Sequence, residues 1–120
     1  MQIIIGTENA TSIDGRHTIL ELDTFRINGN KPVTAYCVID AVPITEMNTI
    51  DNYKKLHLEL MENYRKKNWK FCEDALEHLQ GRWKGEVDSF YIELFKRIQE
   101  LKTQSLPDNW DGIILKNVAT

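Results

Sequence analysis

The side chains of this 120-residue chain that could act as nucleophiles are its serine hydroxyls and its two thiols. Ser12, Ser89 and Ser105 all lack the Gly-x-Ser-x-Gly turn that exposes a catalytic serine. Cys37 and Cys72 have no local catalytic signature, and two small buried thiols are the expected state of both. The sequence therefore predicts no nucleophilic catalysis, and no residue is assigned a catalytic role.

Groups that could hold a metal ion or a phosphate are scattered along the chain. His17, His57 and His78 lie far apart, without a cysteine or carboxylate at zinc-ligand spacing. The 6 glycines stand singly, so no Walker loop and no Gly-x-Gly-x-x-Gly turn is present. Several aspartates are too widely separated to indicate a metal pair and are typical of turns and caps: Asp14, Asp23, Asp40, Asp51 and Asp111. We expect no metal site and no cofactor.

Two features could bind a partner. A basic run, which could bind an anion but also suits the solvated last turn of a helix, contains Arg65, Lys66, Lys67 and Lys70. Trp83 stands between two cations in a predicted loop, so it is the tryptophan that we expect to be exposed. Trp69 and Trp110 are expected to anchor a core.

The overall charge and the apolar runs exclude two classes of partner. Lys and Arg number 15 against 18 Asp and Glu, and this net charge of −3 does not favour a nucleic-acid partner. The longest apolar run, Ile3 to Ile5, is far shorter than a membrane span, and no signal peptide precedes it. We expect a soluble, cytoplasmic protein without membrane insertion.

The first half of the chain reads as β-structure. Short β-prone runs alternate with Asn, Asp, Gly and Pro, at Ile3 to Ile5, Thr18 to Leu22, Phe25 to Ile27 and Val33 to Ile39. Asn28-Gly29 predicts a hairpin, because these two residues tolerate the positive φ angles of a type I′ turn. In the last run, one small apolar face is formed by Val33, Ala35, Cys37 and Ile39, and the other face, with Thr34, Tyr36 and Val38, is more mixed.

The second half has helical periodicity. Apolar residues three and four apart predict one helix from Asp51, as N-cap, to about Lys67 and a second from Trp69 to Leu79. Gly81 suits a left-handed C-cap, and a third helix is expected from Val87 to near Lys102. Short loops imply antiparallel neighbours. The segment from Trp110 to Leu115 reads as extended and could return to the sheet.

These elements predict an α+β fold: a small antiparallel sheet, formed by the N-terminal hairpin and short strands, covered by three antiparallel helices, with a C-terminal extended segment. Residues 1–50 form the β-rich segment and residues 51–120 the helical tail with its C-terminal strand. At this length we expect both parts to share one folded unit.

Several segments resemble the end of a known domain. Ile3-Ile4-Ile5-Gly6-Thr7, Leu20-Glu21-Leu22-Asp23, and Phe25 to Val33 with Tyr36 are similar to the closing strands of class III adenylate and guanylate cyclases. Tyr64 to Trp69, Cys72 and Leu76 resemble a tetratricopeptide-like tail that follows some bacterial cyclase domains, and the stretch from Pro107 to Ile113 resembles the Trp-Asp-Gly ending of such tails.

The resemblance implies a chain without the family's catalytic groups. The family's metal-binding, base-binding and transition-state residues all precede the strand matched by Ile3 to Ile5, and Asn28 occupies the position of a phosphate-contacting lysine. The implied function is a non-catalytic C-terminal portion of a cyclase that acts as an interaction or regulatory module, with a homodimer or a partner cyclase chain as partner. Two alternatives remain open: a subunit that completes a cyclase formed with another chain, and a helical peptide-binding scaffold.

Overall fold

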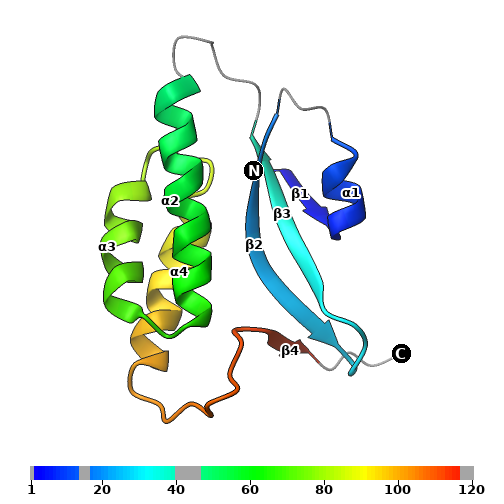
Figure 1. The fold of residues 1–120 in the computed structure, drawn as a ribbon, viewed down its shortest axis with the longest axis vertical. Helices are drawn as coiled ribbons and strands as arrows, with labels where there is room; N and C mark the ends of the chain where they lie inside the picture. Colours follow the sequence, from blue (N-terminus) through cyan, green and yellow to red (C-terminus); the bar gives the residue numbers. More distant parts are fainter. Residues whose placement is uncertain (1, 14–16, 40–46, 117–120) are drawn as a thin grey trace. The chain divides into compact units, whose positions relative to one another are not determined.

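The computed structural model describes residues 2–13, 17–39 and 47–116 (Figure 1). The chain divides into two compact units. The sheet unit comprises Met1–Ala41 with Gly112–Thr120, and the helical unit comprises Val42–Asp111. That the two parts share one folded unit stays a prediction.

The sheet unit contains four strands in the order β1-β3-β2-β4. They are β1 (Gln2–Ile5), β2 (Thr18–Ile27), β3 (Val33–Ile39) and β4 (Ile114–Lys116). β3 pairs antiparallel with both β1 and β2, whereas β4 joins β2 in parallel. The α+β class is confirmed, but the sheet is not antiparallel throughout. The parallel pair arises because the chain returns from the helical unit to the free edge of β2.

The β2–β3 hairpin forms at the predicted turn. Asn28 and Gly29 have φ angles of 50° and 77°, and the Asn30 amide donates to the Ile27 carbonyl at 3.0 Å. Both central residues are therefore left-handed, as a type I′ turn requires. Figure 1 shows β2 and β3 as the two long strands of the sheet.

β2 is one strand rather than the two runs that the sequence suggested. Its register with β3 shifts between Glu21 and Thr24, which marks a bulge at Leu22 and Asp23. Both bulge residues are buried. Two adjacent buried residues break the strict alternation of a regular strand, in which neighbouring side chains face opposite sides. The bulge accommodates both of them, so β2 continues beyond this point. In β3, Ala35, Cys37 and Ile39 are buried as their alternation predicted, but Val33 is only half-buried and Val38, on the opposite face, is buried as well.

A short helix that the sequence analysis missed, α1 (Thr7–Thr11), follows β1. Gly6, at a φ of 92°, makes the corner between them, and its amide donates to the Thr34 carbonyl at 2.9 Å. The Asn9 side chain donates to the Ile5 carbonyl at 2.8 Å. Five residues are too few to show helical periodicity, so no apolar pattern marks this helix in the sequence.

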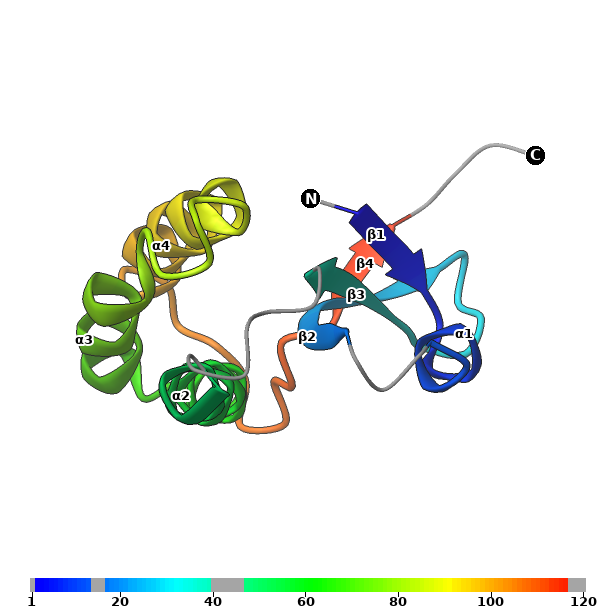
Figure 2. The same cartoon turned by 90° about the horizontal axis from the view of Figure 1, so that it is seen from above.

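The helical unit contains α2 (Met47–Arg65), α3 (Trp69–Leu79) and α4 (Asp88–Leu101), seen nearly end-on in Figure 2. α3 and α4 match their predicted bounds closely, and Gly81 adopts the expected left-handed conformation at a φ of 80°. α2 begins before the predicted N-cap at Asp51, because Ile50 extends the apolar stripe by one further turn. Among the described residues, no helix is long and apolar enough to cross a membrane.

The core of the helical unit lies between its three helices. Each helix contributes a buried stripe at three- and four-residue spacing: Leu60, Met61 and Tyr64 from α2; Cys72, Leu76 and Leu79 from α3; Tyr91, Leu94 and Ile98 from α4. Trp110 packs edge-on against Tyr64 and Trp69, with ring centroids 5.4 and 5.7 Å apart. The segment after α4 is thus anchored to the helices before it reaches β4.

Candidate functional site

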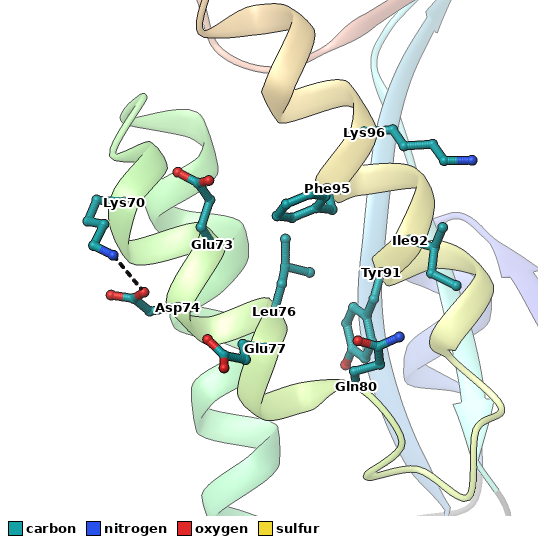
Figure 3. Close-up of a pocket in the computed structure, with 10 residues that line it drawn as sticks. All are labelled: Lys70, Glu73, Asp74, Leu76, Glu77, Gln80, Tyr91, Ile92, Phe95 and Lys96. Atoms are coloured by element: carbon teal, nitrogen blue, oxygen red, sulfur yellow. Dashed lines mark hydrogen bonds and ion pairs between the residues drawn. The ribbon is translucent and has the colours of Figure 1, made fainter.

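A groove of about 550 Å³ runs between α3 and α4 (Figure 3). Its apolar floor is formed by Leu76 from α3 and by Tyr91, Ile92 and Phe95 from α4, while polar side chains form the rims: Lys70, Glu73, Asp74, Glu77 and Gln80 on α3, and Lys96 on α4. All of these residues belong to the helical unit. The groove is the candidate functional site.

Two large apolar side chains of α4 project into or beside this groove instead of entering the core. Ile92 is 45% exposed and Phe95 is 43% exposed. The buried stripe of α4 uses Tyr91, Leu94 and Ile98, so Ile92 and Phe95 form a second apolar line three residues apart on another side of the helix. A helix that only needed to pack against α2 and α3 would carry polar residues at these positions.

Two carboxylates of the α3 rim take part in ion pairs within the chain. Lys70 pairs with Asp74 at 3.1 Å, and this hydrogen bond raises the lysine pKa. Glu73 accepts hydrogen bonds from Gln99 and from Lys102, each at 3.1 Å, and these bonds lower the pKa of Glu73. Both ion pairs are accessible to solvent, so the carboxylates keep most of their charge.

Glu77 and Lys96 are the two exceptions. Within the described part of the chain, neither side chain makes a hydrogen bond or an ion pair, and both are exposed. Figure 3 shows them on opposite sides of the apolar floor. Glu77 nevertheless lies close enough to Lys70 for its negative charge to contribute to the raised pKa of that lysine.

The four cations of the basic run, Arg65, Lys66, Lys67 and Lys70, lie in different surroundings, and partner binding by them stays a prediction. Lys67 donates to the Pro107 carbonyl at 3.2 Å. Arg65 is half-buried, and this burial lowers its pKa, whereas the negative charge of Asp111 acts in the opposite direction and raises it. Lys66 is exposed, and only Lys70 reaches the groove. Two of the four cations therefore lie against the segment that follows α4.

Trp83 is buried, so the prediction that it is exposed is wrong. Only 2% of it is accessible, and its indole N–H donates to the Tyr91 hydroxyl at 2.9 Å. The same hydroxyl lies 2.9 Å from Nδ1 of His57, which is also buried. The prediction of exposure was based on the two charged neighbours, Arg82 and Lys84. These two side chains are exposed, but the loop turns Trp83 inward.

Trp83, Tyr91 and His57 form a chain of two hydrogen bonds. Indole N–H is a donor only, so the Tyr91 oxygen accepts from Trp83, while the direction of the bond between the Tyr91 hydroxyl and Nδ1 of His57 depends on the histidine tautomer. Burial lowers the pKa of His57 from 6.5 to about 4, which agrees with a neutral ring at physiological pH. This network joins α2, α4 and the loop between α3 and α4, and it holds Tyr91 in the groove floor.

Cys37 and Cys72 are free and buried, which confirms the prediction for the thiols. Burial raises the pKa of the Cys72 thiol to about 12, so this thiol is protonated at neutral pH. In the part of the chain that the structure describes, no group of three or more His, Cys, Asp or Glu is arranged to hold a metal ion.

The chain matches no protein-family model, no curated protein and no solved structure in the three comparisons made.

Proposed function

We propose that this chain is a protein-interaction module, and that the groove between α3 and α4 receives helical surface from a partner. The observation that carries the proposal is the exposure of Ile92 and Phe95 beside the groove. Exposed apolar side chains that gather at one concave site favour a docking function, whereas single scattered ones need no explanation. Helix-in-groove recognition uses this arrangement of apolar anchors at three- and four-residue spacing.

The polar groups around the groove favour a protein partner over a small molecule. A small-molecule site needs a few polar groups that converge on the ligand. Here Asp74 and Glu73 are bound to groups of the chain itself, and Glu77 and Lys96 lie apart on opposite sides of the groove. An extended apolar strip flanked by separated charges suits a helix surface.

A photocrosslinking amino acid placed at Phe95 tests this proposal. We expect it to give a crosslinked product when the full chain is irradiated in its native cells, because position 95 would face the partner. The matched control is the same amino acid at Leu58, a residue of α2 that is 49% exposed and lies outside the groove. Products at 58 but not at 95, or at neither position, would contradict the proposal.

We also propose that this module is a cytoplasmic, non-catalytic portion of a class III nucleotide cyclase. The support is the resemblance of segments such as Leu20 to Asp23 and Pro107 to Ile113 to that family. Incubation of the purified chain with ATP or GTP and Mn²⁺ is expected to give no cyclic nucleotide. Product from the chain alone would refute the non-catalytic assignment, whereas product only after addition of a candidate cyclase chain would favour the completing-subunit alternative.

A further inference from the structure

We infer that the outer edge of β1 is an interaction surface of the sheet unit, and that it pairs with β1 of a second copy of this chain. The two strands run antiparallel about a two-fold axis that passes between their Ile3 residues, so the sheets of the two copies join into one. The inference concerns the sheet unit and is independent of the groove of the helical unit.

β1 forms one edge of the four-stranded sheet (Figure 1), and among the residues that the structure describes no strand pairs with its outer side. The Gly6 amide, directly after β1, donates to the Thr34 carbonyl of β3 at 2.9 Å. Backbone groups of successive residues in a strand point alternately to its two sides, so those of Ile3 and Ile5 point away from β3. This edge therefore offers N–H and C=O groups to another strand.

Ile3 is the centre of this outer edge. The Asn9 side chain donates to the Ile5 carbonyl at 2.8 Å, so one acceptor is already used within the chain. Of the two outward-facing residues, only Ile3 keeps both its donor and its acceptor for an added strand, as far as the described residues go. In an antiparallel pair, two opposed residues can exchange both of these bonds. Two-fold symmetry about Ile3 provides this exchange, because each Ile3 amide then meets the Ile3 carbonyl of the other copy.

The side chains of this edge are apolar and exposed. Ile3 is 45% exposed and Ile5 is 54% exposed, and the two lie on the same face of the sheet. β1 carries no charged residue, whereas protected edges are short or carry charges. The opposite edge follows that rule, since β4 has three residues and ends in Lys116. In the antiparallel pair, Ile3 lies directly opposite its symmetry mate and diagonal to Ile5 of the other copy, so the four isoleucines cover one another.

An already ordered strand fits this edge better than a flexible peptide. Fixing the backbone of one residue costs as much free energy as one hydrogen bond contributes on balance, or more. A flexible peptide would have to order several residues for the few hydrogen bonds that a strand as short as β1 provides. β1 of a second copy is held in place by β3 before the contact forms, so this cost does not arise. It also supplies the same donor, acceptor and apolar side chains that the first copy offers, and it brings no charge to the axis.

Charge substitutions at Ile3, followed by analytical ultracentrifugation of the purified full chain, test the inference. We expect the wild-type chain of 14.0 kDa to form dimers of twice that mass as its concentration rises. Ile3→Lys and Ile3→Glu should each weaken the dimer about tenfold, because each places like charges directly opposite each other across the axis. Ile3 is exposed at the sheet edge, so both variants should keep the wild-type circular dichroism spectrum.

A mixture of the two variants gives the sharpest result. An equimolar mixture of the Ile3→Lys and Ile3→Glu chains should recover dimerisation close to the wild-type level, because opposite charges then face each other. Only an interface that places position 3 of one copy against position 3 of the other gives this recovery. Two controls should leave the dimer unchanged: Leu115→Lys on the β4 edge, where the side chain is 72% exposed, and Phe95→Asp beside the groove.

Ile3→Pro tests the backbone contact separately from the charge. Proline removes the outward amide of Ile3 but no hydrogen bond to β3, so the chain should fold and remain monomeric. A wild-type chain that stays monomeric up to about 1 mM, where even weak specific pairing shows, would overturn the inference. A mixture no more dimeric than either charged variant alone would do the same. A dimer that Phe95→Asp dissociates and Ile3→Lys does not would place the contact at the groove, which refutes the edge inference and leaves the proposed docking function standing.

Discussion

Replacing Trp83 by alanine is expected to lower the free energy of unfolding by about 3–5 kcal/mol. The indole is almost fully buried in the helical unit, so its removal leaves a large cavity. The substitution also removes the donor to the Tyr91 hydroxyl. Chemical denaturation followed by circular dichroism measures the effect, and a loss this large would leave many small domains largely unfolded.

Trp83→Phe separates the two contributions to this effect. Phenylalanine keeps much of the ring volume but offers no N–H, so the loss should fall to about 1–3 kcal/mol. Lys84→Ala, at the exposed neighbouring position, is the matched control and should change the stability little. If Trp83→Ala were as stable as Lys84→Ala, Trp83 would be a surface residue, as the sequence suggested.

Acidification from pH 6.5 to pH 4 is expected to destabilise the helical unit by about 3 kcal/mol through His57 alone. Burial lowers the pKa of this histidine from 6.5 to about 4 in the folded chain. The unfolded chain therefore binds a proton at a higher pH than the folded chain does. The contribution of His57 to the free energy of unfolding is fully present above pH 6.5, decreases as the pH falls below that value, and stops decreasing near pH 4.

Denaturation midpoints measured across this pH range test the prediction when wild type is compared with His57→Gln. The variant removes the titrating ring. The part of the slope of stability against pH that comes from this residue should therefore disappear, even if the variant is less stable than wild type at pH 7. Equal slopes in wild type and His57→Gln would show that His57 is not buried in its neutral form.

Local signals in the sequence were enough to predict most of the elements. Asn28-Gly29 and Gly81 adopt the left-handed conformations that their residue types favour, because few other residues do so without strain. Apolar spacing located α3 and α4 for a similar reason, since the buried stripe must repeat with the helical period. The bulge at Leu22 and Asp23 escaped the same reasoning, because it breaks the alternation on which the strand prediction depends.

The candidate site was missed for a related reason. Sequence motifs mark reactive groups, whereas the groove is defined by apolar side chains, Ile92 and Phe95, on a side of α4 away from its core stripe. Their spacing of three residues is visible in the sequence. That the opposite helix supplies Leu76 and Glu77 to the same groove is not visible there, because this depends on how α3 and α4 pack together.

The sequence by itself determined the α+β class, the hairpin turn, the ends of α3 and α4 and the burial of both thiols, because each follows from local backbone preference or from periodic hydrophobicity. Only the tertiary structure decided that Trp83 points inward to Tyr91 and His57, that β4 joins β2 in parallel, and that Glu77 and Lys96 flank one groove. These features join residues distant in the chain, and packing, not local preference, selects such contacts.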